Sequence, residues 1–236
     1  MDELPVVNID TPVAILKGHN SLIYGVAFSP DGKTLASGCE DSDGIKLWDV
    51  ATGQVKGRLK EKTGFILSVQ FHPDGNILAS TSGWDAVVRL WGIGKETEPV
   101  RLEAPFGEED ASTTITTPDG KKTYRGQIKR VSFHPQGKIL ATAGPGRSVR
   151  VRDIQARKLL TTLPAHPGTV TAVAFSPDGK TLATASVVGN SSKEPGSLKL
   201  RDTANWQETG NLPGLKSAVD SIAFHPKGTT IATCET

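Results

Sequence analysis

The 236-residue sequence predicts an all-β fold built from pairs of strands that are joined by tight turns. A phrase of the form Phe-Ser/His-Pro-x-Gly recurs five times, and an apolar residue with two small residues follows each copy. Because Pro fixes φ and Gly accepts positive φ, the phrase is typical of a turn between two strands. Apolar and polar residues alternate further along each copy, as in half-buried strands, and no segment shows helical periodicity.

The five copies are spaced like the blades of a β-propeller. From Pro30 to Pro73 the step is 43 residues and from Pro135 to Pro177 it is 42, close to the roughly 40 to 45 residues of a four-stranded blade. The longer steps after Pro73 and Pro177 indicate insertions at residues 103–126 and 187–196. The sequence therefore predicts a single propeller domain over residues 1–236, with blades at 20–59, 64–102, 127–163 and 168–212 and a partial blade at 218–236.

Four complete blades and half of a fifth should form an incomplete ring. Residues Val13 to Leu16 have the pattern of a fourth strand that would complete the last blade, yet the third strand beside it is missing. Open sheet edges and an apolar blade flank would then be exposed. We expect these open blade edges to permit self-association.

The first strand of each unit carries apolar residues at a step of three followed by a step of two. This break in alternation predicts a β-bulge near the start of the strand. The residues on either side of the first apolar position should then point towards the loop face of the disc. The apolar trios expected to be buried are Ile23, Val26 and Phe28; Ile66, Val69 and Phe71; Ile128, Val131 and Phe133; and Val170, Val173 and Phe175.

The pairs Gly18-His19 and Trp48-Asp49, together with the fivefold phrase, resemble the WD-repeat (WD40) family over nearly the whole chain. The resemblance implies a β-propeller whose blades are stiffened by a hydrogen-bonded tetrad of His, a strand Ser or Thr, a loop Asp and Trp. The matching residues are His19, Ser37, Trp48 and either Asp41 or Asp43 in blade 1, Ser80, Asp85 and Trp91 in blade 2, and His166 in blade 4. Since Arg152 and Arg201 stand at the Trp positions of blades 3 and 4, we expect those blades to depend on apolar packing.

The sequence contains no catalytic or cofactor-binding motif with credible spacing, so we expect no enzyme activity and no cofactor. Three histidines, His72, His134 and His225, might suggest a metal cluster by number alone. Each occupies the turn position that Ser29 and Ser176 hold in the other copies, which indicates turn residues and no metal site. The positions expected to line the central channel are mostly small, which excludes an acid and base pair there.

We therefore expect a non-catalytic scaffold for protein–protein interaction. The expected partner surface is an apolar patch on the loop face of blades 1 and 2, formed by Leu22, Tyr24, Phe65, Leu67 and Trp84. The first four flank the predicted bulges, and the family resemblance implies a partner contact for the residue before the loop Asp, which is Trp84. Clustered aromatic residues are typical of interaction hot spots. An alternative is that the insertion covers this patch with Phe106 or Ile115 and makes it internal core.

Two other functions remain open from the sequence. Between Lys121 and Lys158 there are eleven basic residues and one acid, Asp153, so the third blade could bind nucleic acid or another polyanion. The chain could also be a regulatory or sensory part of a larger protein.

Composition points to the cytoplasm and excludes a membrane partner. No apolar run approaches the roughly 18 residues that span a bilayer, and the first residues lack the basic and apolar pattern of a secretory signal. Cys39 and Cys234 are too few for a disulfide framework, and we expect both to be buried free thiols.

Overall fold

The computed structural model describes residues 14–40, 44–60, 65–83, 85–95, 98–103, 113–117, 120–124, 127–144, 147–164, 166–187, 196–212, 215 and 217–235. All regular elements in these ranges are β-strands, which confirms the all-β prediction. No helix in the described part of the chain is long and apolar enough to cross a membrane.

Four antiparallel sheets contain four strands each in chain order, and a fifth contains two. We call these sheets blades 1 to 5. Blade 1 comprises β1 (Ile23–Phe28), β2 (Thr34–Cys39), β3 (Ile45–Asp49) and β4 (Val55–Leu59), and blade 2 comprises β5 (Ile66–Phe71), β6 (Ile77–Ser82), β7 (Val87–Gly92) and β8 (Val100–Glu103). Blade 3 comprises β11 (Arg130–Phe133), β12 (Ile139–Ala143), β13 (Val149–Asp153) and β14 (Lys158–Leu163). Blade 4 comprises β15 (Thr169–Phe175), β16 (Thr181–Val187), β17 (Ser197–Asp202) and β18 (Glu208–Asn211), and blade 5 comprises β19 (Val219–Phe224) and β20 (Ile231–Glu235).

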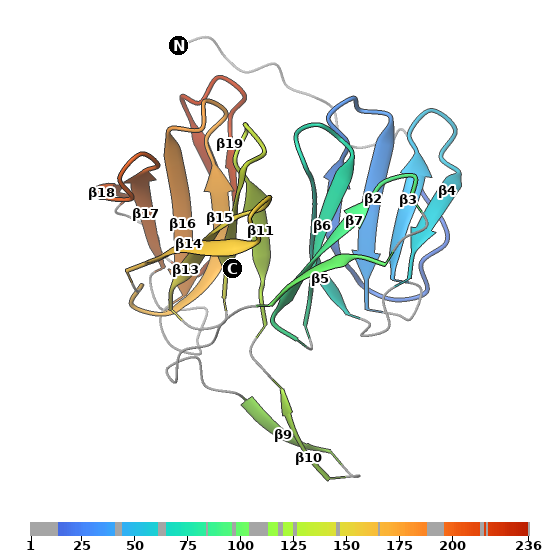
Figure 1. The fold of residues 1–236 in the computed structure, drawn as a ribbon, viewed down its shortest axis with the longest axis horizontal. Helices are drawn as coiled ribbons and strands as arrows, with labels where there is room; N and C mark the ends of the chain where they lie inside the picture. The colour runs from blue at the N-terminus through green and yellow to red at the C-terminus, as the bar shows by residue number, and fades with distance from the viewer. Residues whose placement is uncertain are drawn as a thin grey trace.

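The blades follow one another around a central channel. Their first strands β1, β5, β11, β15 and β19 are innermost and line this channel, and each contacts the first strand of the next blade. Blades 1 and 2 stand on one side of Figure 1 and blades 3 to 5 on the other. The result is an open propeller ring, as the repeat count predicts.

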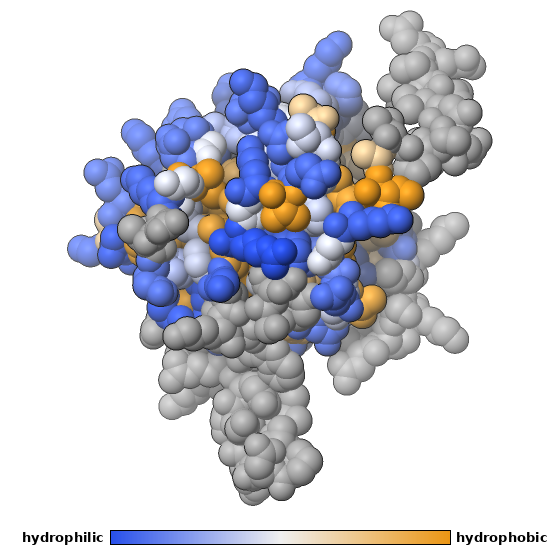
Figure 2. Space-filling view, turned by 90° about the vertical axis from the view of Figure 1, so that its right-hand side faces the viewer, coloured by the Kyte–Doolittle hydropathy of each residue, from blue (hydrophilic) through white to orange (hydrophobic). Residues whose placement is uncertain are grey.

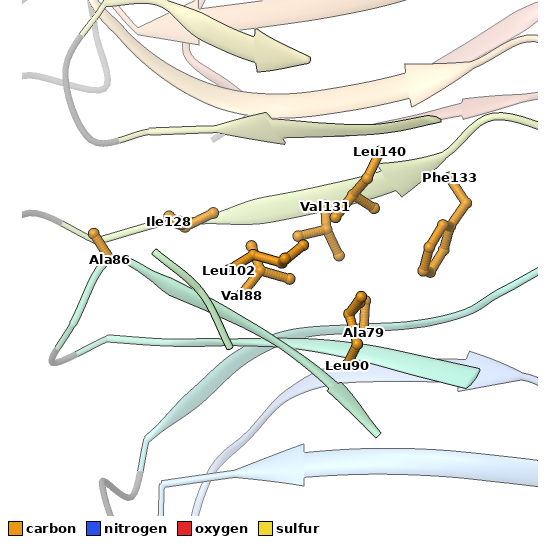
Figure 3. Packing of buried hydrophobic residues seen from close by; sticks show 9 residues of the cluster. All are labelled: Ala79, Ala86, Val88, Leu90, Leu102, Ile128, Val131, Phe133 and Leu140. Carbon is orange, nitrogen blue, oxygen red and sulfur yellow. The ribbon is translucent and has the colours of Figure 1, made fainter. Parts of the chain in front are cut away.

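The hydrophobic core lies between blades, where each first strand packs against the preceding blade. Ile128, Val131 and Phe133 face Val88 and Leu90 of blade 2 in Figure 3. The trios of blades 2 and 4 pack in the same way against blades 1 and 3. A register shift near the start of β1, β5, β15 and β19 confirms the predicted bulge in those four strands.

The first trio departs from expectation. Ile23, Val26 and Phe28 are 50%, 63% and 62% exposed, whereas the corresponding residues of blades 2 to 4 are buried. The prediction that this trio is buried is wrong because, among the residues that the structure describes, no blade packs against this side of β1. Cys234 is also exposed, contrary to expectation, since β20 lies at the other end of the arc without a third strand beside it.

The predicted strand at Val13 to Leu16 does not form in the part that the structure describes. Residues 14–16 have no strand structure, and Val13 lies outside the described residues. A strand needs a neighbour to satisfy its backbone hydrogen bonds, and blade 5 has no third strand to supply them.

The long insertion contains a hairpin of β9 (Thr113–Thr117) and β10 (Gly120–Tyr124). In Figure 1 this hairpin projects away from the blades on the loop face. Phe106 lies outside the described residues, and so does most of the second insertion, at 188–195.

Candidate functional site

At the edge of blades 1 and 2 the structure brings two of the five residues of the predicted patch, Tyr24 and Phe65, into contact. The rings of Tyr24 and Phe65 meet edge to face, with centroids 4.9 Å apart and an interplanar angle of 74°. Leu22 and Tyr24 are 64% and 39% exposed, and Phe65 and Leu67 are partly exposed. Trp84 lies outside the described residues. We call Leu22, Tyr24, Phe65 and Leu67 the loop-face patch.

The bulges in β1 and β5 explain how these side chains reach the surface. Each bulge adds one residue between the first and second apolar positions of its strand, between Ile23 and Gly25 in β1 and between Ile66 and Ser68 in β5. The additional residues are Tyr24 and Leu67. Because a bulge turns its residues out of the regular alternation, both point away from the inter-blade core.

The position of the Phe65 ring depends on an unusual backbone conformation and on the glycine at position 83. Its φ is 57°, in the left-handed region that non-glycine residues seldom occupy. A Cβ atom on Gly83 would come within 1.8 Å of Cδ1 of the Phe65 ring, so only glycine allows the ring to lie there. Sequence reasoning missed this role of Gly83, although a glycine between two strands near an aromatic position is a usable signal.

The hydroxyl group of Tyr24 gives the patch a polar end. Desolvation raises the pKa of Tyr24, and the Glu40 carboxylate raises it further by repelling the phenolate and accepting a hydrogen bond from the hydroxyl. The phenol therefore remains neutral, with its hydroxyl directed to Glu40. Glu40 was not predicted, because it follows the end of β2 and is close to Tyr24 only after the strands pair.

Hydrophobic groups interrupt the hydrophilic surface on the side of the molecule that carries blade 1 (Figure 2). The large exposed hydrophobic residues on β1 and beside it are Leu22, Ile23, Tyr24, Val26 and Phe28. This distribution separates two surfaces, the loop-face patch and the flank of β1 that carries the unburied trio.

The predicted tetrad residues of blade 1 come together. Ser37 Oγ accepts a hydrogen bond of 2.7 Å from Trp48 Nε1 and lies 2.6 Å from His19 Nε2. The His19 and Trp48 rings lie 6.0 Å apart. Asp41 and Asp43 fall outside the described residues.

Blade 2 uses its predicted residues in a different arrangement. Trp91 Nε1 donates to Ser80 Oγ at 2.8 Å, as in blade 1. Asp85 accepts two hydrogen bonds from Arg89, at 3.1 and 2.7 Å, and so neutralises a guanidinium that is almost completely buried. A bidentate carboxylate pair is among the strongest ways to satisfy a buried arginine.

Blade 4 has a polar network beside its apolar packing. His166 Nε2 lies 2.8 Å from Thr184 Oγ1. Arg201, at the Trp position, lies 3.6 Å from the Glu208 carboxylate, which also pairs with Lys199 at 3.1 Å. Desolvation and, to a smaller extent, the charges of Lys199 and Arg201 lower the pKa of His166 to about 4.

The turn histidines link neighbouring blades. His72 Nε2 lies 2.9 Å from the carbonyl oxygen of Gly137, and His134 Nε2 lies 3.0 Å from that of Gly179. Their rings also meet Phe133 and Phe175 edge to face. In the described part of the chain no three His, Cys, Asp or Glu residues are placed to hold a metal ion.

The basic third blade does not present all its charge to solvent. Arg150 and Arg152 lie on β13 and are each 4% exposed. Desolvation lowers the pKa of Arg152, and the charge of Arg150 lowers it further. These two guanidinium groups therefore cannot contact a polyanion at the surface.

Comparison with known proteins agrees with the geometry. The family model for the WD domain, G-beta repeat (WD40), matches residues 10–49, 53–92, 118–153 and 157–190, which is more than half of the chain. The vegetative incompatibility protein HET-E-1 of Podospora anserina is 53% identical over 38 residues, 16% of this chain and 3% of that protein. The chain thus covers only a small part of that relative's length. The repeats, the bladed fold and the family match together show that this chain belongs to the WD40 repeat family.

Proposed function

We propose that this chain is a non-catalytic protein-interaction module that binds a partner protein through the loop-face patch. The observation that carries the proposal is the Tyr24–Phe65 aromatic pair, which stays accessible to solvent at the bulge of β1 and at the residue before β5. Aromatic groups on a preorganised surface lose little conformational entropy when a partner covers them.

Two features favour a partner over an internal lid. The patch residues that the structure describes all remain at least partly exposed, and the β9–β10 hairpin extends away from the blades in Figure 1. Membership of the WD40 family supports an interaction module in general. Trp84 belongs to the proposed surface by its place in the sequence, before Asp85.

The same proposal includes that the protein has no enzyme activity and that it is located in the cytoplasm. The channel strands carry small side chains at most of their inward positions, with Arg130 as the main exception. A single guanidinium gives no acid and base pair. The two cysteines and the composition favour the cytoplasm.

Nucleic-acid binding through blade 3 is less well supported. Two of its arginines are buried, and a polyanion site gains affinity from cations that reach phosphate groups. We therefore propose a protein partner and use the polyanion as a competitor in the test.

The test compares two double variants in affinity capture with quantitative mass spectrometry. The patch variant carries Leu22→Ala and Tyr24→Ala, and the control carries Leu159→Ala and Leu160→Ala, which remove exposed apolar groups from β14. We expect specific partners to be lost from the patch variant and kept by the control, with equal melting temperatures. Retention of the same proteins by both variants would contradict the proposal, and so would loss of every partner on addition of heparin alone.

A further inference from the structure

A concave site lies between blades 2 and 3, on the face of the propeller opposite the loop-face patch. It is formed by the turns that join the first to the second strand and the third to the fourth strand in these blades. The cleft has a volume of about 640 Å³, within the range of about 300 to 1,000 Å³ that is usual for ligand sites. We call it the inter-blade cleft.

The floor of the inter-blade cleft is apolar. Ile77, Leu90, Val100 and Ile154 line it and belong to the hydrophobic cluster between the two blades or pack against it. Leu90 lies near Phe133 at one end of that cluster in Figure 3. Aliphatic side chains of a ligand would therefore extend an existing core.

One wall of the cleft is formed by the end of β7. In blade 2 the fourth strand pairs with the third only as far as Leu90 and Val100. In blade 3 the equivalent pairing continues to Asp153 and Lys158. Trp91 and Gly92 line the cleft beyond the pair of Leu90 and Val100. The Ile93–Asn76 hydrogen bond and the Leu78–Trp91 register direct the backbone groups of Trp91 towards β6, and the carbonyl oxygen of Gly92 accepts a hydrogen bond from Lys95 N. This wall therefore offers little free backbone, and a ligand in the cleft would be held mainly through its side chains.

The rim of the cleft is positively charged. Lys95, Lys138 and Arg157 are exposed and line it, and Glu98 is the single acidic side chain among the described lining residues. None of the three cations forms an ion pair with a residue that the structure describes. The unbalanced charge favours an anionic ligand.

Arg157 occupies a position that favours glycine. Its φ is 56°, and the equivalent turn residues are Gly53 in blade 1, with φ of 69°, and Trp206 in blade 4, with φ of 63°. Trp206 packs against the core between blades 3 and 4, which accounts for a large side chain there. Arg157 is exposed and contributes no such packing. Strained backbone of this kind persists where the side chain has a function.

We propose that the inter-blade cleft binds an extended peptide segment of a partner protein in which apolar and acidic side chains alternate. The segment lies along the cleft, places its apolar side chains on the cleft floor, and directs its carboxylates to Lys95, Lys138 and Arg157. A nucleic acid fits less well, because the floor is aliphatic and the Trp91 ring is buried and bound to Ser80.

The test uses a fluorescent peptide of alternating Leu and Glu, titrated with the whole chain and followed by anisotropy. Arg157→Gly is the decisive variant, since it removes the guanidinium and also relieves the backbone. We expect affinity to fall at least about tenfold while the melting temperature stays equal or rises. A peptide with Gln in place of Glu should bind as weakly, and Tyr24→Ala should leave the affinity unchanged.

The outcomes of this experiment test the inter-blade cleft independently of the proposed function of the loop-face patch. Equal affinity of wild type and Arg157→Gly would overturn it, as would equal binding of the Glu and Gln peptides. Displacement of the peptide by a single-stranded oligonucleotide at equal concentration would show a general anion surface and would also overturn it. Loss of binding in Tyr24→Ala would place the peptide on the opposite face.

Discussion

The first strands of blades 1 and 3 carry the same apolar trio, Ile-x-x-Val-x-Phe, in opposite environments. Val131 and Phe133 of blade 3 are about 5% exposed, whereas Val26 and Phe28 of blade 1 are more than 60% exposed. The residue types and the spacing are the same, so the difference comes from the neighbouring blade alone. Burial in this fold is therefore a property of the joint between two blades and not of a single repeat.

The largest expected effect tests this comparison directly. Phe133→Ala should lower the free energy of unfolding by about 3 to 5 kcal/mol, because it leaves a cavity between blades 2 and 3. Phe28→Ala should change it by less than about 1 kcal/mol, since that ring is already largely exposed. Urea unfolding of both variants measures the difference. Equal losses would mean that β1 is covered in solution, for example by a second copy of the chain.

The second prediction concerns blade 4, where the buried histidine His166 should make the free energy of unfolding depend on pH. The folded pKa of His166, about 4, lies below its unfolded value, so the unfolded chain binds more protons between these values. The free energy of unfolding should therefore decrease as the pH falls, by about 2 kcal/mol between pH 7 and pH 5. Urea unfolding of wild type and His166→Gln at both pH values should show this loss only in the wild type. An identical pH dependence would assign the loss to other groups.

A smaller effect compares the turns of blades 1 and 3 that join the third and fourth strands. Arg157→Gly should stabilise the chain by about 1 kcal/mol, because glycine accepts its positive φ without steric cost. Gly53→Ala should destabilise it by a similar amount for the same reason. Arg157→Ala is the control, since it removes the guanidinium but keeps the strain. Stabilisation by Ala equal to that by Gly would point to charge and not to the backbone.

The smallest effect is expected from the insertion. Replacing residues 104–124 with a short linker should alter the free energy of unfolding by less than about 1 kcal/mol, because loop length enters only logarithmically. The trio that begins at Ile128 resumes the repeat directly after the insertion, so no blade strand is removed. Thermal unfolding followed by circular dichroism should remain a single transition. A broad or split transition would show that the hairpin belongs to the core.

The sequence was sufficient for the blade strands, four of the five bulges and three of the four trios, because these follow from local periodicity and turn chemistry. It was wrong about a strand at Val13 to Leu16, which would have needed a neighbouring strand that blade 5 does not supply. It could not show that Ile23 is exposed, since that depends on which blade stands next to it. It also could not show that Asp85 pairs with Arg89, because several acids and bases are close in sequence and only the folded loop selects among them. The inter-blade cleft was missed for the same reason, as its walls come from two repeats.

The turn histidines make the joints of the propeller unequal. The joints between blades 2 and 3 and between blades 3 and 4 each carry a His ring seated on the next turn's glycine carbonyl. In the two outer joints the corresponding residues are Ser29 and Ser176, whose hydroxyls bond instead within their own turns to Asp31 and Asp178. Each blade of a repeat protein is stabilised mainly by its neighbours. The joints that lack this histidine hydrogen bond between blades should therefore open first. Blade 3, at the centre of the arc, should therefore be the most stable blade. Local unfolding should begin at blades 1 and 5 and spread inward.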